Sequence, residues 1–424
     1  MKRLILAAAL LAGFSFVAGA MANEKGEYLA RAGDCVACHS VPGGRAFAGG
    51  LKMASPVGTL YTTNITPDPE TGIGSYTLED FDRSIRRGIA RDGHRLYPAM
   101  PYPSYAKLTG SDIADLYDYF MHDVPAVRQA NRANEIPPFL SPRWPLAVWN
   151  VVYTPSPGFT PDPGKDAQWN RGAYLVEGLG HCGACHSPRG TAWQEKSLDA
   201  RDSSFLAGAN LDDWYAPSLR ANQATGLGSW SQGEIAEFLK TGHNRHAVAY
   251  GSMGDVINNS TPYLTDSDLA AIAAFLASLP ATEAETAWVE DTSTAQALLS
   301  GKTDTAGAAL YVSACQTCHR ANGAAAPPYV PPLAGNPTVL DKDPASLINI
   351  VLNGSWPLVA KGRPDAYRMP QFREQLKDRQ IAEVVSFIRG AWGNKAGAVS
   401  PQEVAALRKS TQPSSDNIVV LKMR

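Results

Sequence analysis

The stretch Cys35-Val36-Ala37-Cys38-His39 lies near the N-terminus, and its pattern returns twice. The second copy is Cys182-Gly183-Ala184-Cys185-His186, and the third is Cys315-Gln316-Thr317-Cys318-His319. These three stretches contain all six cysteines of the 424-residue chain. No cysteine is therefore left for a disulfide or a free thiol elsewhere.

The shared pattern Cys-x-x-Cys-His is the attachment signature of c-type haem. On a helix, residues i and i+3 lie on one face, so both thiols can form thioethers with the vinyl groups of one porphyrin. The next residue, His, is then placed to bind the iron. We therefore predict three covalently bound haems c, attached through Cys35 and Cys38, Cys182 and Cys185, and Cys315 and Cys318, with the iron ligands His39, His186 and His319.

Three other interpretations of the motif fit less well. A structural zinc site usually takes four ligands from two converging pairs, whereas this chain has three pairs, each with a His at the same offset. A thioredoxin-like redox motif would occur once, near a βαβ pattern. A disulfide within Cys-x-x-Cys would close too short a loop to stabilise much chain.

The composition is that of a loop-rich globular protein, with 37 Gly, 31 Pro and a net charge of −2. It gives no indication of a nucleic-acid partner. Residues 1–22 join Lys2-Arg3, an apolar run and small residues, which predicts a signal peptide cleaved after Ala20 or Ala22. An uncleaved anchor is disfavoured because this run is short, and no later stretch is long and apolar enough to span a bilayer.

One unit occurs three times, and internal repeats of this kind define the fold. Each unit begins with a helix that carries the haem motif at its end. A Gly/Pro-rich loop, a capped helix, a Met-bearing loop and a final apolar helix follow. We predict an all-α protein with unit one at 23–133, unit two at 169–280 and unit three at 305–393.

Local signals place the helices within these units. Thr77 with Asp80 resembles a capping box, and Ser231 with Glu234 is a full one. Thr265 precedes another helix, and Asp343-Pro344 begins a helix with Pro at its first position. The segment Gly226-Leu227-Gly228-Ser229-Trp230 repeats Gly72-Ile73-Gly74-Ser75-Tyr76 almost residue by residue.

Pro-rich linkers join the units. The linker 134–168 contains Trp144, Trp149 and Tyr153, so we expect it to pack in the groove between units one and two. The second linker, 281–304, has a less distinctive sequence. In the tail, 394–424, a capping box at Ser400 predicts a short helix to about Lys409.

Each unit also offers one methionine as a sixth iron ligand. Met100, Met253 and Met369 follow their own haem-motif histidines by 61, 67 and 50 residues, between the capped and final helices. A His/Met ligand pair raises the haem potential and closes the iron to substrates. The rivals for this role are Met53, Met121 and His94 in unit one, and His243 and His246 in unit two; ordinary packing is the other interpretation of the methionines.

A proximal His normally donates its second ring N–H to a carbonyl. The loops containing Pro42, Pro188 and Pro332 are placed to supply that carbonyl. Aromatic residues near each motif, namely Tyr61, Trp230 and Trp356, are candidates either for bonds to haem propionates or for the small cores.

Taken together, the chain resembles the three-haem cytochrome c subunits of bacterial membrane-bound dehydrogenases that oxidise alcohols, gluconate or other sugar acids and polyols. The resemblance covers essentially the whole mature chain. Besides the haem motifs and the two Gly-x-Gly-Ser-aromatic segments, it includes Pro142-Arg143-Trp144-Pro145-Leu146-Ala147-Val148-Trp149-Asn150 and the tail from Val399-Ser400 to Leu407-Arg408-Lys409. It implies three tandem cytochrome c domains.

The resemblance also implies a non-catalytic electron-transfer subunit on the periplasmic side of the inner membrane. Such subunits accept electrons from a catalytic dehydrogenase subunit carrying FAD or pyrroloquinoline quinone, sometimes with a small third subunit, and pass them to ubiquinone or a terminal oxidase. Some members carry a C-terminal membrane anchor, whereas this tail is polar. A freely diffusing periplasmic electron carrier and a haem peroxidase are the alternative functions.

Overall fold

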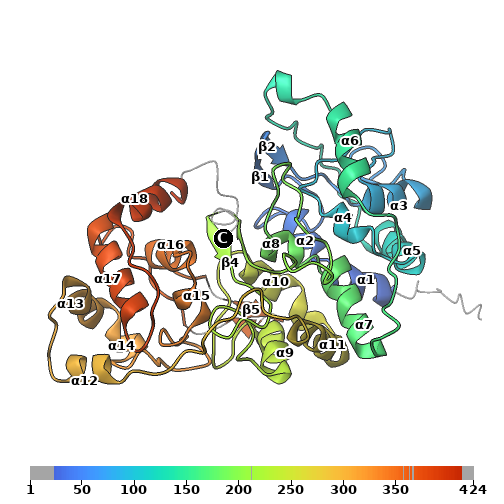
Figure 1. Cartoon of the computed structure of the whole chain (residues 1–424). Helices are drawn as coiled ribbons and strands as arrows, with labels where there is room; N and C mark the ends of the chain where they lie inside the picture. Colours follow the sequence, from blue (N-terminus) through green and yellow to red (C-terminus); the bar gives the residue numbers. More distant parts are fainter. Residues whose placement is uncertain (1–22, 212, 357, 362, 365–366, 413–424) are drawn as a thin grey trace, which may run out of the picture.

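A computed structural model describes residues 23–412 except 212, 357, 362, 365 and 366 (Figure 1). The predicted signal peptide and the last twelve residues of the tail, 413–424, lie outside the described residues. The described chain is mainly helical, as predicted, but it also contains three short two-stranded antiparallel sheets. No helix among the described residues is long and apolar enough to cross a bilayer.

Unit one begins with α1, which is capped by Asn23, and the last of its α-helices continues as a π-helical turn. Its elements are α1 (Glu24–Ala32), α2 (Cys35–Cys38), β1 (Lys52–Ser55), β2 (Gly58–Tyr61), α3 (Leu78–Arg87), α4 (Tyr102–Tyr105), α5 (Gly110–Asp118) and η1 (Tyr119–Asp123). The predicted capping box of α3 forms between Thr77 and Asp80. Phe81 is the buried residue of α3.

Unit two follows the same order of elements. They are α7 (Ala167–Tyr174), η3 (Leu175–Leu179), α8 (Gly183–His186), β3 (Ala209–Leu211), β4 (Trp214–Ala216), α9 (Gln232–Thr241), α10 (Met253–Asn259), η4 (Thr261–Tyr263) and α11 (Asp266–Ala277). The predicted caps at Ser231 and Thr265 both form. Figure 1 shows this unit, in green and yellow, between the other two.

Unit three has a shorter loop after its haem motif. Its elements are α13 (Ala306–Ala314), α14 (Gln316–His319), α15 (Pro337–Leu340), α16 (Ala345–Asn353), β5 (Val359–Ala360), β6 (Arg363–Pro364) and α17 (Asp378–Gly390). Pro344 is the N-cap of α16 rather than its first residue. The tail helix α18 (Pro401–Ser410) forms as predicted and packs on α16 and α17.

The first and last helices of each unit cross at a glycine. A Cβ atom on Gly26 would lie 2.3 Å from the Asp115 carbonyl oxygen of α5. The equivalent distances are 2.0 Å between Gly172 and Ala271 of α11, and 2.3 Å between Gly307 and Glu383 of α17. Only a residue without a side chain lets the two backbones approach so closely. The three glycines therefore fix one helix crossing in every unit.

Units one and two share a single apolar core. One cluster of buried residues runs from Leu29 to Leu279, whereas unit three has its own cluster from Ala295 to Val404. Buried polar contacts also join the first two units, because Lys107 Nζ lies 2.7 Å from Glu177 Oε2. A smaller cluster of Ala249, Ile257 and Leu358 joins units two and three.

The linkers differ in part from expectation. The first contains η2 (Pro138–Leu140) and α6 (Trp144–Tyr153). Trp149 does bridge units one and two, since its ring packs on Tyr102 and its Nε1 donates to the Ala192 carbonyl at 2.9 Å. Trp144 is instead 73% exposed, so only one of the two linker tryptophans fills the groove. The second linker contains α12 (Ser293–Leu299), which packs on the core of unit three.

Candidate haem sites

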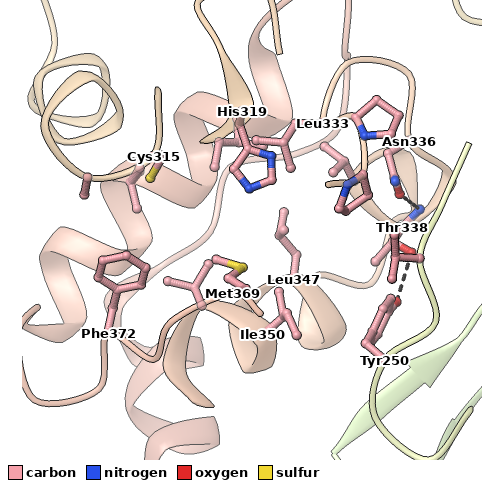
Figure 2. A pocket seen from close by; sticks show the side chains of 18 of the residues that line it. Tyr250, Cys315, His319, Leu333, Asn336, Thr338, Leu347, Ile350, Met369 and Phe372 are labelled. Carbon is pink, nitrogen blue, oxygen red and sulfur yellow. Dashed lines mark hydrogen bonds between the residues drawn. The ribbon is translucent and has the colours of Figure 1, made fainter. Parts of the chain in front are cut away.

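The predicted ligands of unit three meet at one cavity. His319, Met369 and Cys315 all line it, and Figure 2 shows the imidazole and the thioether on opposite sides of the space. The surrounding side chains are mostly apolar and come from unit three with a contribution from unit two; they include Leu333, Leu347, Ile350, Val351, Phe372, Leu376, Val248 and Tyr250. The site thus joins a nitrogen and a sulfur donor across an apolar space, with a thiol at its edge.

His319 is held in the neutral state by its surroundings. Burial lowers the pKa of His319 to about 4, and the nearby Pro331 carbonyl acts weakly in the opposite direction. The neutral imidazole is the form that can coordinate a metal. Its Nδ1 is buried and makes no hydrogen bond with the described residues.

The other two proximal histidines are fixed by backbone carbonyls. His39 Nδ1 donates to the Thr63 carbonyl at 2.7 Å, and His186 Nδ1 donates to the Pro217 carbonyl at the same distance. A carbonyl oxygen only accepts, so Nδ1 carries the proton and Nε2 keeps its lone pair. Burial also lowers the pKa of both histidines. Both imidazoles are therefore set to bind a metal through Nε2.

The prediction that the accepting carbonyls lie near Pro42 and Pro188 was wrong. In units one and two the second strand of a hairpin ends just before the accepting residue, β2 before Thr63 and β4 before Pro217. The hairpin brings back a more distant part of the loop, which local sequence does not reveal. In unit three no strand lies between His319 and Pro331, and the neighbouring carbonyl belongs to Pro331 rather than Pro332.

The loops that follow the first two motifs share their backbone hydrogen bonds. Gly49 donates to the His39 carbonyl as Gly208 donates to the His186 carbonyl, both at 2.8 Å. A second matched pair, both at 2.9 Å, joins Ile65 to Phe47 and Leu219 to Leu206. The repeat seen in the sequence is thus a repeat of hydrogen bonds around the proximal histidines.

The haem motif does not continue the preceding helix, which corrects the predicted order of elements. α1 ends at Ala32, Asp34 takes a left-handed conformation (φ 48°), and α2 begins at Cys35. In unit two His181 takes the equivalent conformation (φ 35°) before α8. In these two units the break makes the haem motif a separate helical turn.

The six cysteines, all within the described residues, form no disulfide. Burial raises the pKa of the Cys182 thiol to about 12 and of the Cys315 thiol to about 11, so neither is a reactive thiolate. Within the described part of the chain, no three His, Cys, Asp or Glu side chains converge as a metal cluster. The structure therefore offers no support for the zinc or disulfide interpretations.

The other two methionines also lie between the capped and final helices of their units. Met100 packs against the shared core immediately before α4, and Met253 begins α10 and packs against the cluster between units two and three. Among the rivals, Met53 pairs with Leu60 in the first hairpin, and Met121 packs against the core.

The rival histidines have other contacts. His94 is exposed and pairs with Asp92. The His246 ring stacks on Trp230, with centroids 4.9 Å apart, and its Nε2 lies 3.3 Å from Glu234. His243 packs edge-on against Tyr329 of unit three.

The three aromatic candidates have different surroundings. The Tyr61 hydroxyl already donates to Glu135 at 2.7 Å. Trp230 Nε1 is buried and makes no hydrogen bond with the described residues, so its N–H remains available as a donor. Trp356 is partly exposed.

Comparison with known proteins agrees with this geometry. Residues 170–280 match the family model described as cytochrome c. Residues 302–388 match that of cytochrome c oxidase, cbb3-type, subunit III.

Relatives extend the match over most of the chain. The chain is 49% identical, over 93% of its length and 86% of the relative's, to the cytochrome c subunit of alcohol dehydrogenase (quinone) from Gluconacetobacter polyoxogenes. It is 48% identical to the gluconate 2-dehydrogenase cytochrome c subunit of Pantoea cypripedii, over 93% and 92% of the two chains. The chain belongs to this family of dehydrogenase cytochrome c subunits. The fructose dehydrogenase cytochrome subunit of Gluconobacter japonicus is 36% identical, over 91% and 82%.

Family membership implies covalently bound haem c, and the third site fits that group. A neutral imidazole and a thioether face each other across apolar walls, and Cys315 lies at the edge where a vinyl group would be bonded. Two facing ligands are what a closed, electron-transferring haem requires. Haem c would supply one-electron transfer in such a site, where His319 and Met369 would hold the iron between apolar walls.

Sequence reasoning missed the carbonyl acceptors of Thr63 and Pro217. Every residue carries a backbone carbonyl, so composition and motif give no signal for this role. Thr63 lies 24 residues after His39, whereas Pro217 lies 31 residues after His186, so spacing from the motif gives no signal either.

Proposed function

We propose that this protein is an electron-transfer subunit that carries three haems c. Electrons from a periplasmic catalytic dehydrogenase subunit, containing FAD or pyrroloquinoline quinone, pass through the haems to ubiquinone or a terminal oxidase. The observation that carries the proposal is the facing pair His319 and Met369 in an apolar cavity beside Cys315. The names of the relatives support a dehydrogenase partner.

Each unit would hold one haem. The thioethers would form at Cys35 and Cys38, Cys182 and Cys185, and Cys315 and Cys318. The iron ligands would be His39 with Met100, His186 with Met253, and His319 with Met369. The carbonyls that orient His39 and His186, and the three equivalent glycine crossings, support one domain for each unit at 23–133, 169–280 and 305–393.

The proposal includes export and assembly. Residues 1–22 would be removed, and the mature chain would work on the periplasmic side of the inner membrane. No residue of this chain would act on the organic substrate, because a His/Met pair leaves no open position on the iron.

Purification from gently solubilised membranes tests the proposal. We expect a flavin- or quinone-containing catalytic subunit to accompany the protein, and its cofactor and activity would identify the substrate. Recovery of the chain alone, without such a subunit, would favour a freely diffusing carrier. A high-spin ferric haem in the resting protein would instead favour a peroxidase, because that chemistry needs an open iron.

A further inference from the structure

Unit two contributes directly to the wall of the third haem site. Ala247, Val248 and Tyr250 line the cavity that contains His319 and Met369. Figure 2 shows Tyr250 at its edge, reaching Thr338, with the two hydroxyl oxygens 2.9 Å apart. Tyr250 also precedes Met253, the proposed sixth ligand of the second site, by three residues. Tyr250 thus lies in the loop that carries Met253 and also in the wall of the third site.

Trp214 connects Tyr250 with the other side of the second site. Its ring is 7% exposed and lies 5.4 Å from the Tyr250 ring, centroid to centroid. A Cβ atom on Gly251 would lie 2.9 Å from the indole, so the indole packs directly on the Met253 loop. Trp214 also begins β4, which leads to the Pro217 carbonyl that holds His186. Trp214 therefore contacts the loop that carries Met253 and lies in the strand that leads to Pro217.

The β3–β4 hairpin is fastened to unit three. Tyr215 N donates to Ser346 Oγ, and Ser346 Oγ donates to the Tyr215 carbonyl, both at 2.9 Å. Asn349 Nδ2 donates to the Asp213 carbonyl at 3.1 Å. Ser346 and Asn349 are buried in α16, which also supplies Leu347 and Ile350 to the cavity. These bonds hold the hairpin that carries Trp214 against unit three, and the contact with Thr338 holds Tyr250 there.

We propose that Trp214 and Tyr250 form the contact across which electrons pass between the second and third haem sites. This inference rests on the proposed function, since it needs a haem in each site. With a haem in each site, one electron would pass from the reduced site to the oxidised one, so that the first is oxidised as the second is reduced. No bond forms or breaks, no proton moves, and both rings keep their own oxidation state. Unit two then stands in the middle of the path, with unit three at one end.

Electron injection from a fixed point tests the contact. Lys409, exposed on α18 of unit three, is changed to Cys and labelled with a photosensitiser. The added thiol is the only free one if the native cysteines hold haem. A flash should reduce the third site first, and a second phase should report transfer into unit two. Redox titration of each protein gives the midpoint potentials that distinguish the haems.

We expect Tyr250→Leu and Trp214→Leu to slow the second phase several-fold, with unchanged midpoint potentials and three haems per chain. Tyr250→Phe keeps the ring and should retain nearly the native rate. The control is Tyr117→Leu, which removes a partly buried tyrosine of unit one whose hydroxyl donates to the Tyr76 carbonyl at 2.9 Å. It should leave the phase unchanged.

A native rate in both leucine variants, with three haems present, would overturn this inference and leave the proposed function intact. An equal slowing in Tyr117→Leu would also overturn it, because the effect would not be specific to the contact. Fewer than three haems in the unsubstituted protein would instead reject the proposed function.

Discussion

At the scale of single residues, the surroundings of each proximal histidine set its protonation state. The carbonyls of Thr63 and Pro217 accept hydrogen bonds from Nδ1 of His39 and His186. For His319, burial lowers the pKa and so keeps the imidazole neutral. A bond from Nδ1 raises the basicity of the ligating nitrogen. In the third site His319 Nδ1 makes no such hydrogen bond with the described residues, and the Pro331 carbonyl is its neighbour.

Replacing Met369 by His tests the sixth ligand of that site. Thioether sulfur favours the ferrous state more than imidazole does, so one midpoint potential should fall while the other two stay constant. Spectro-electrochemical titration measures all three. The control Met121→Leu changes a methionine that packs against the shared core, and it should shift none of them. Unchanged potentials in Met369→His would remove this residue as a ligand.

Glu195 should make stability depend on pH. Burial raises its pKa to about 7, although Arg189 opposes the shift, and its Oε2 makes no hydrogen bond with the described residues. The unfolded chain ionises near pH 4.3. The folded protein therefore loses stability as pH rises from about 4 to 7, because it must bury a charge or keep a proton that the unfolded chain releases.

The variant Glu195→Gln removes this effect. Above pH 7 it should exceed the native protein in unfolding free energy by up to about 3 kcal/mol, and near pH 4 the two should be equal. Denaturant unfolding at several pH values provides the comparison. A constant difference between the proteins from pH 4 to pH 8 would show that the carboxyl is not held neutral.

At the scale of elements, the crossing of first and last helices sets the shape of each unit. Gly172→Ala would place a Cβ 2.0 Å from the Ala271 carbonyl oxygen, so α7 and α11 must separate. We expect a loss of about 1–3 kcal/mol in unfolding free energy, typical of overpacking. Gly110→Ala is the matched helical control, since nothing lies within 4 Å of its Cβ. A loss no larger than that of the control would contradict the crossing.

Helix starts were predictable because their signals are local. The capping boxes at Thr77, Ser231 and Ser400 all form where the sequence indicates. The breaks before the haem motifs were not predictable, because positive φ is uncommon for any residue other than Gly, even for Asp and His, the types found at positions 34 and 181. The strands of the three hairpins are two to four residues long, too short for an alternating pattern to identify them.

At the scale of the whole molecule, units one and two form one body. Their shared core and the pair of Lys107 with Glu177, each under 10% exposed, could not be read from the repeat. Residues that face another unit differ between copies, and these two are 70 positions apart. Repeated motifs in the sequence predict the units and their candidate ligands, but no comparable signal indicates the interfaces between units.

Lys107→Met should strongly lower the unfolding free energy of the body formed by units one and two. It leaves the Glu177 carboxylate buried without its cation, which typically costs about 3–5 kcal/mol of unfolding free energy. Adding Glu177→Met should recover much of this loss. The control Lys342→Met breaks an exposed pair with Glu283, 2.8 Å apart, and should cost less than about 1 kcal/mol. Denaturant unfolding compares the variants, and equal losses in both single variants would contradict a buried coupling.

The number of haems per chain tests the central claim most directly. The mature protein is denatured, its covalently bound haem is quantified by absorption spectroscopy, and the polypeptide is quantified independently by amino-acid analysis. The proposal of one haem in each unit predicts three haems c per chain. Two or fewer would contradict it.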